Sequence, residues 1–230
     1  MSYIALARKY RPSGFEEVIG QEAIGLTLKN ALKLDRVHHA YLFHGPRGVG
    51  KTSMARILAK ALTCEKGPTD KPCGKCGACK DIDTSRSLDV IEIDGASNRG
   101  IDDVRTIREN VKFAPANGRY KIYIIDEVHQ ITPDAFNALL KTLEEPPPHA
   151  KFIFATTAVQ KVPATILSRC QGFNFKRIPT HVICSVLENI AKSENFKADK
   201  DALFEIAKAA DGSLRDSQSL LDQSASFAQG

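Results

Sequence analysis

The sequence has no hydrophobic run long enough to cross a membrane, because no apolar stretch reaches the roughly 18–20 residues that a spanning helix needs. Its N-terminus lacks the apolar core and the small-residue cleavage site of a secretory signal peptide. Internal repeats and low-complexity segments are also missing. The composition, with 43% hydrophobic and 26% charged residues, excludes a disordered tail, a collagen and a coiled coil. We therefore expect a globular, cytoplasmic protein that does not bind membranes.

Charge of one sign is present only in modest excess. The 230 residues carry a net charge of +5 at pH 7, which suits one large or two small domains without a strongly basic surface. Basic residues outnumber acidic ones in 1–178, whereas acidic residues outnumber basic ones in 179–230. A mildly basic body suits an anionic partner such as a nucleotide or a nucleic acid, although the same excess also favours solubility.

Short apolar segments alternate with helical patterns along most of the chain. The apolar segments have strand length and span 40–43, 90–93, 120–125 and 151–155. The helical patterns between them span 51–62, 102–111 and 133–145. Near-continuous apolar strands indicate a parallel sheet that is covered on both faces. The alternation therefore predicts an α/β, doubly wound fold.

After Phe175 the hydrophobic pattern of the sequence changes. Strand-like segments stop, and helical periodicity runs through 180–192, 199–210 and 213–228, with a helix break at Gly212-Ser213. We expect two domains, a core over 1–178 and a small helical domain over 179–230.

Residues 45–52 match the pattern G-x-x-x-x-G-K-[ST] in full. In such a P-loop, glycines let successive backbone N–H groups point at phosphate oxygens, and the helix that follows adds its dipole. Lys51 is then expected to reach the β- and γ-phosphates, and the Thr52 hydroxyl to hold Mg²⁺. An expected strand precedes the motif and an expected helix follows it, as the motif requires. The predicted nucleotide-binding residues are Gly45, Pro46, Arg47, Gly48, Val49, Gly50, Lys51 and Thr52.

The apolar segment 120–125 ends in Asp126-Glu127. The strand delivers Asp126 to the carboxyl edge of the sheet, where its carboxylate orients Mg²⁺. Glu127 is then expected to polarise the attacking water as general base. An Asp-Glu pair in this place favours hydrolysis of the nucleotide over its passive storage.

Six cysteines in a cytosolic chain are not expected to form disulfides. Four of them gather as Cys64-x8-Cys73-x2-Cys76-x2-Cys79, a spacing that predicts a tetrahedral, structural Zn²⁺ site within 64–79. An iron–sulfur cluster and unmetallated thiols are the alternatives. The adjacent His38 and His39 are expected in a loop or at a helix end, and Glu144-Glu145 marks a helix that ends at prolines.

These motifs together resemble the clamp-loader branch of the AAA+ ATPases. The resemblance rests on the P-loop, on Asp126-Glu127, on the segment Asn137–Pro147 (NALLKTLEEPP) and on Ser168-Arg169-Cys170. The four-cysteine insert narrows the resemblance to one family, the bacterial clamp loader of the DNA polymerase III holoenzyme. It covers essentially the whole chain, from Ala7 to Asp216.

The resemblance implies roles for further residues. Thr157 matches the sensor of the γ-phosphate, with Thr156 as its rival, and Arg169 matches an arginine finger that acts in trans on a neighbouring subunit's nucleotide. Arg215 matches a second phosphate sensor in a helical lid. Tyr10, Arg11 and Ile19 resemble the segment near the adenine. A collar domain is expected to follow residue 230, so the chain is expected to be a shortened form.

The implied function is that of an ATP-hydrolysing motor subunit, without a polymerase site of its own, in a complex that works as a DNA-directed DNA polymerase. Its implied partners are the other subunits of a hetero-pentamer, the sliding clamp and primed DNA. The DNA is expected to be held through its phosphates, with Arg99 and Arg105 as candidate contacts. The alternatives are a non-hydrolysing AAA+ scaffold and another zinc-bearing AAA+ motor, such as a branch-migration helicase. The intact P-loop argues against the scaffold, and the cysteine insert against the helicase.

Overall fold

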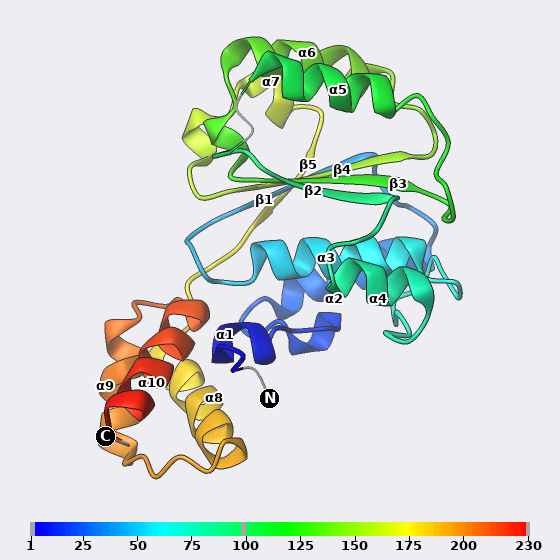
Figure 1. The fold of residues 1–230 in the computed structure, drawn as a ribbon. Coiled ribbons are helices and arrows are strands. Elements are labelled where there is room, and N and C mark those ends of the chain that lie inside the picture. Colours follow the sequence, from blue (N-terminus) through cyan, green and yellow to red (C-terminus); the bar gives the residue numbers. More distant parts are fainter. Residues whose placement is uncertain (1–2, 98–99, 229–230) are drawn as a thin grey trace.

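The computed structural model describes residues 3–97 and 100–228 and is built on a single parallel sheet (Figure 1). Its strands are β1 (Ala40–His44), β2 (Val90–Asp94), β3 (Lys121–Asp126), β4 (Ala150–Thr156) and β5 (Gln171–Asn174). Their order across the sheet is β2-β3-β4-β1-β5, and each neighbouring pair is parallel. The predicted doubly wound sheet is confirmed, with β5 as an additional strand at its edge.

Helices cover both faces of the sheet (Figure 1). One face carries α2 (Glu22–Lys33), α3 (Lys51–Thr63) and α4 (Gly77–Asp83), and the other carries α5 (Ile101–Asn110), α6 (Pro133–Glu144) and α7 (Ala164–Leu167). Side chains that alternate along each strand point into two separate cores. Phe43 and Ile124 lie in the core under α3, whereas Leu42 and Phe154 lie in the core under α6. Each such buried side chain contributes about 1.5–3 kcal/mol, so the strands are held firmly.

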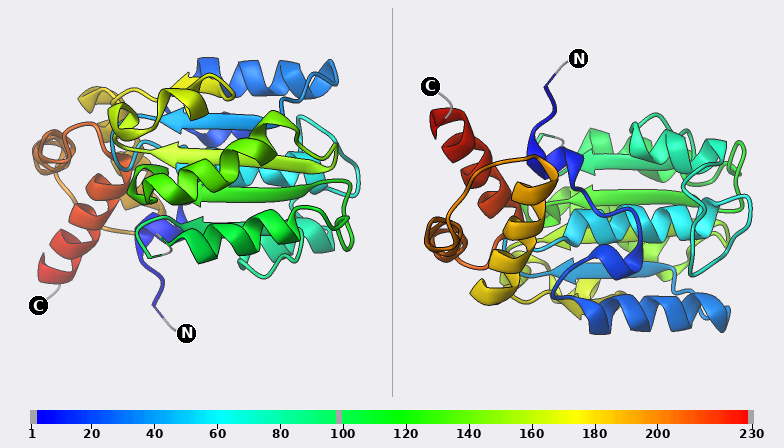
Figure 2. Two further views of the ribbon diagram at one scale, coloured as in Figure 1. Left: turned by 90° about the horizontal axis from the view of Figure 1, so that it is seen from above. Right: turned by 90° about the horizontal axis from the view of Figure 1, so that it is seen from below.

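The last three helices form a separate group at one end of the sheet (Figure 2). They are α8 (Thr180–Ser193), α9 (Lys200–Ala209) and α10 (Leu214–Ala228), and the short α1 (Leu6–Lys9) packs beside them. Leu6 shares a core with Leu187, Leu203 and Leu221 from these three helices. Lys9 forms an ion pair of 2.6 Å with Glu194, just after α8. The N-terminal segment is therefore fastened to the helical group.

Within the described residues, the short 3-10 helices are η1 (Phe15–Glu17), η2 (Val128–Gln130) and η3 (Val159–Lys161). Between Tyr3 and Ala228, leaving out 98–99, no helix has both the length and the apolar character needed to cross a bilayer.

Candidate functional site

Strand order brings three loops to one edge of the sheet. β4 lies between β3 and β1, and all three strands run in the same direction. The residues that follow them therefore meet at the carboxyl edge, which is where open α/β sheets bind ligands. These residues are the P-loop after β1, Asp126-Glu127 at the end of β3 and Thr156-Thr157 at the end of β4.

The P-loop joins β1 to α3 through backbone conformations that favour glycine. Gly48 and Gly50 have φ of +73° and +102°, in the left-handed region that other residues adopt only with strain. Gly50 is the residue before α3, so the loop ends at the N-terminus of a 13-residue helix. Free N–H groups and the positive end of the helix dipole suit a phosphate at this point.

Lys51 is buried at the start of α3 and its ammonium group turns back into the loop. Its Nζ donates to the carbonyl oxygens of Gly45 at 2.9 Å and of Pro46 at 2.6 Å. Burial lowers the pKa of Lys51, and the carboxylates of Glu127 and Asp126 oppose that shift. A buried cation whose hydrogen bonds go to neutral carbonyl oxygens is stabilised by an added anion, so the site is suited to a phosphate group.

Thr52 and Asp126 lie in direct contact although 74 residues separate them in the sequence. The Thr52 hydroxyl donates to Asp126 Oδ2 at 2.6 Å, which sets a hydroxyl and a carboxylate oxygen side by side. Oxygen ligands of these two kinds are those that Mg²⁺ prefers. The pair therefore fits the predicted magnesium site.

Glu127 is held in a left-handed conformation, with φ of +46°, directly after β3. Its carboxylate is bound by Thr157, whose N–H and hydroxyl donate to Glu127 Oε2 at 3.1 and 2.9 Å. Thr156 is instead buried, and its hydroxyl accepts from the N–H of Ala158 at 3.0 Å. Of the two threonines, Thr157 is thus the one that faces the predicted general base.

The helical group touches the P-loop through the first turn of α10. The Arg215 N–H donates to the carbonyl oxygen of Gly48 at 3.3 Å. A Cβ atom on Gly48 would come within 1.9 Å of the Ser213 hydroxyl, so Gly48 also allows this close approach. The structure thereby brings Arg215, predicted to contact phosphate, next to the loop predicted to bind it.

Positive charge and an apolar cavity lie beside this contact. Partial burial lowers the pKa of Arg11, the nearby guanidinium groups of Arg56 and Arg215 lower it further, and the carboxylate of Glu92 opposes that shift. Tyr10 and Ile19 line a cavity together with Leu214, which directly precedes Arg215. The predicted adenine segment therefore borders both an apolar pocket and a basic cluster, although Arg11 itself is not among the lining residues.

Arg169 lies after α7, and an ion pair holds its side chain within the chain. Its guanidinium contacts Glu144, at the end of α6, at 2.5 Å, and it donates to the carbonyl oxygen of Thr165 at 2.6 Å. About a third of the side chain remains exposed, which leaves it open to a neighbouring molecule. Among the DNA candidates, Arg105 is exposed and paired with Asp102 at 2.9 Å, and Arg99 lies outside the described residues.

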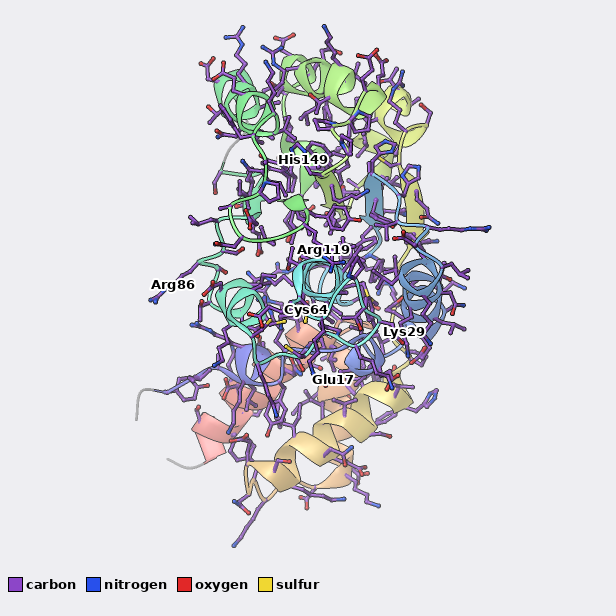
Figure 3. The ribbon with its side chains drawn as sticks, turned by 90° about the vertical axis from the view of Figure 1, so that its right-hand side faces the viewer. Glu17, Lys29, Cys64, Arg86, Arg119 and His149 are labelled. Carbon is purple, nitrogen blue, oxygen red and sulfur yellow. The ribbon has the colours of Figure 1, made fainter. Side chains whose placement is uncertain are left out.

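The four predicted zinc ligands come together at the end of α3, where Figure 3 labels Cys64. Cys64 directly follows α3, and the Sγ atoms of Cys64, Cys73, Cys76 and Cys79 all lie within 4.8 Å of one another. Hydrogen bonds from the N–H groups of Lys75 and Cys76 lower the pKa of Cys73 to about 6, whereas burial raises that of Cys79. Four convergent thiols, one of them biased toward thiolate, fit a tetrahedral Zn²⁺.

One residue of the site was not predicted from the sequence, and it is His129. It lies in η2, two residues after Glu127, and its Nδ1 is 3.1 Å from Glu127 Oε2. One signal in the sequence could have pointed to His129, namely its nearness to Asp126-Glu127.

Two family models match this chain. One is described as DNA polymerase III, delta subunit, and matches residues 20–179. The other is described as the ATPase lid domain of the DNA polymerase III clamp loader subunit and matches residues 182–230. The two matches meet close to the start of α8.

Relatives and solved structures agree with these matches. The chain is 56% identical to the DNA polymerase III subunit tau of Bacillus subtilis, over 99% of this chain and 40% of that protein. It is 53% identical to the Escherichia coli subunit tau, over 100% of this chain and 36% of that protein. It therefore spans less than half the length of these relatives.

The Thermotoga maritima RuvB Holliday junction branch migration motor superposes with a TM-score of 0.69 at 20% identity, over 96% of this chain and 66% of that one. At this identity the likeness shows the fold alone. The resemblance seen in the motifs is confirmed by the family models and the relatives, and the chain belongs to the DNA polymerase III tau/gamma family of clamp-loader AAA+ ATPases.

Proposed function

We propose that this chain binds ATP at the carboxyl edge of its sheet and hydrolyses it as a motor subunit of a bacterial replicative clamp loader. The observation that carries the proposal is the meeting of Lys51, Thr52, Asp126 and Glu127 at one edge. A scaffold that only binds a partner has no need of a buried lysine, a metal-type oxygen pair and a carboxylate in this arrangement.

The triphosphate is bound by the N–H groups of residues 45–52 and by the ammonium group of Lys51. Lys51 leaves the carbonyl oxygens of Gly45 and Pro46 and turns to the β- and γ-phosphates. Thr52 and Asp126 hold Mg²⁺, which when bound neutralises charge on the phosphate oxygens. Tyr10, Arg11 and Ile19 form the adenine side of the site. The cavity lined by Tyr10 and Ile19 supports this role.

Glu127 orients the attacking water and accepts its proton. Thr157 senses the γ-phosphate, because its hydroxyl is the donor that faces both Glu127 and the edge of the sheet. Arg215 contacts phosphate from the lid in the same chain. Arg169 leaves Glu144 and reaches the nucleotide of a neighbouring subunit, where it stabilises the charge of the transition state.

The cysteine module holds a structural Zn²⁺ through Cys64, Cys73, Cys76 and Cys79. Four protein ligands leave no position for a reacting molecule, so the ion stabilises the module and takes no part in hydrolysis. We divide the chain into a nucleotide-binding core over 1–178 and a lid over 179–230, in accord with the matches to 20–179 and 182–230.

The partners that we infer are the other loader subunits, the sliding clamp and primed DNA, all in the cytoplasm. ATP binding favours the state that grips clamp and DNA, and hydrolysis removes that preference. A branch-migration motor is the second candidate, since RuvB shares the fold. The family models and the identity to tau subunits favour the clamp loader.

The test is ATP hydrolysis by the assembled loader, measured alone, with sliding clamp, and with clamp plus primed DNA. We expect the rate to rise when both are present. A rate that responds only to four-way DNA junctions would support the branch-migration motor, and no hydrolysis under any condition would support the scaffold.

A further inference from the structure

His129 points at the carboxylate of Glu127. The left-handed conformation of Glu127 reverses the chain, and a hydrogen bond of 2.8 Å from Gln130 N–H to the Glu127 carbonyl oxygen closes η2. This tight turn returns the imidazole to the edge of the sheet. Nδ1 of His129 lies 3.1 Å from Glu127 Oε2 and 2.9 Å from the Thr156 hydroxyl, and only 8% of the side chain is exposed.

The contacts of His129 favour a proton on one of its two nitrogens. A carboxylate can only accept, so the nitrogen that faces Glu127 carries the proton. The Gln130 amide nitrogen faces Nε2 at 3.1 Å and donates to it. These contacts therefore favour the tautomer with its proton on Nδ1, between Glu127 Oε2 at 3.1 Å and the Thr156 hydroxyl oxygen at 2.9 Å.

Glu127 Oε2 thus accepts hydrogen bonds from the N–H and the hydroxyl of Thr157, and Nδ1 of His129 lies 3.1 Å from the same oxygen. A hydroxyl has one proton. If Thr157 donates that proton to a γ-phosphate, it no longer donates it to Glu127. His129 and the Thr157 N–H are then the groups that still hold the carboxylate.

We propose that His129 is a positioning residue for Glu127, which keeps the carboxylate in place when the Thr157 hydroxyl turns to the nucleotide. The inference rests on the proposed function, because it requires Glu127 to be the base. His129 itself touches neither nucleotide nor water in this account. Its effect is on the orientation of Glu127, so it acts on the rate of hydrolysis and not on the affinity for ATP.

Two isosteric variants test the proposal in the assembled loader with clamp and primed DNA. In His129→Asn the amide nitrogen occupies roughly the place of Nδ1, whereas in His129→Gln it lies nearer the place of Nε2. We expect Asn to keep most of kcat and both Gln and Ala to lower it on the order of 10–100-fold, the range for small misplacement of a catalytic group. KM and the affinity for a fluorescent ATP analogue should change less than about twofold in all three.

If His129 only fills space, the variants should rank differently by kcat. Gln is then at least as good as Asn, because its volume is closer to that of His, and this order would overturn the proposal. So would an ATP affinity that falls in step with kcat.

Glu127→Gln separates this inference from the proposed function. If Glu127→Gln still hydrolyses ATP at a normal rate, the role proposed for Glu127 is wrong. If it is inactive and His129→Ala is fully active, only the inference about His129 fails. Side-chain ¹⁵N shifts of His129 in the unmodified protein give a reading that requires no variant to fold: we expect the Nδ1–H tautomer, and the Nε2–H tautomer would contradict the proposal.

Discussion

The edge of the sheet and the cysteine module are built in opposite ways. At the edge, groups from distant parts of the chain are placed by strands whose apolar side chains are buried in two cores. They also satisfy one another: Lys51 binds loop carbonyls, Thr52 binds Asp126, and Glu127 binds Thr157. The module gathers four thiols within 16 consecutive residues, and its helix α4 buries only Cys79 and Ile82. The edge should therefore persist without its ligand, whereas the module should depend on its ion.

The largest expected effect comes from Arg169. It tests whether one chain provides all the groups that hydrolyse its nucleotide or needs a residue of its neighbour. Arg169 is held by Glu144 and not by the P-loop of its own chain, so we expect Arg169→Ala to abolish hydrolysis at the neighbour's site. Loss of an arginine finger costs on the order of 10³–10⁵ in rate. The measurement is single-turnover hydrolysis in loaders with one variant subunit.

Arg86→Ala is the matched control, because Arg86 is exposed and extends away from the body of the molecule (Figure 3). It should leave the rate unchanged. Fast hydrolysis by monomers of the unmodified chain would contradict the trans role of Arg169.

The next largest effect is expected from loss of the Lys51 charge, which tests whether this cation binds phosphate at the edge of the sheet. Lys51→Met removes the buried cation, and a charge-assisted hydrogen bond is worth about 1.5–3 kcal/mol. We expect ATP affinity to fall roughly 10–100-fold, as measured with a fluorescent analogue. The melting temperature of the nucleotide-free protein serves as the control and should not fall, since the buried charge destabilises the empty site. An unchanged affinity would show that Lys51 does not contact phosphate.

A smaller effect is expected from loss of a zinc ligand, which tests whether the cysteine module and the edge of the sheet are independent of each other. In Cys76→Ser one thiolate ligand is lost, so zinc content should fall below one ion per chain and the melting temperature should fall by several degrees. ATP affinity should change by less than about threefold, because the edge is held by the strands. Cys184→Ser, outside the cluster, is the control. Equal zinc content in the two variants would contradict the assigned ligands, and lost ATP binding would contradict the independence of the two regions.

The smallest effect concerns DNA. Arg105 is paired with Asp102 on the exposed side of α5, so any contact that it makes to a phosphate is weak. Removing one such contact should reduce the log–log salt dependence of DNA binding by about 0.9. Arg105→Ala in the assembled loader gives this slope. If the slope does not change, Arg105 is a surface residue only.

Local spacing predicted the parts of the site that lie close together in sequence. The P-loop and the cysteine cluster are complete within short segments. The buried strands were predicted from their continuous apolar residues. β5 was missed because Gln171–Asn174 has no buried apolar run. Its place comes from backbone pairing with β1, which sequence periodicity does not record.

Side-chain partners across the fold could not be predicted in the same way. The choice between Thr156 and Thr157 depends on where β4 ends, and a shift of one residue turns a side chain to the other face. The contact of His129 with Glu127 depends on the left-handed turn at Glu127, which is an unusual conformation for that residue type. The pairing of Arg169 with Glu144 joins residues 25 positions apart on separate elements.

The most direct test of the account is Glu127→Gln in the assembled loader, read by ATP binding and single-turnover hydrolysis in the same samples. The amide keeps the size and most hydrogen bonds of the side chain but cannot accept a proton, so ATP affinity should remain within about threefold. Hydrolysis should fall on the order of 10²–10⁴, the usual contribution of a general base. If hydrolysis continues at the normal rate, Glu127 is not the base, and the central claim about the edge of the sheet is wrong.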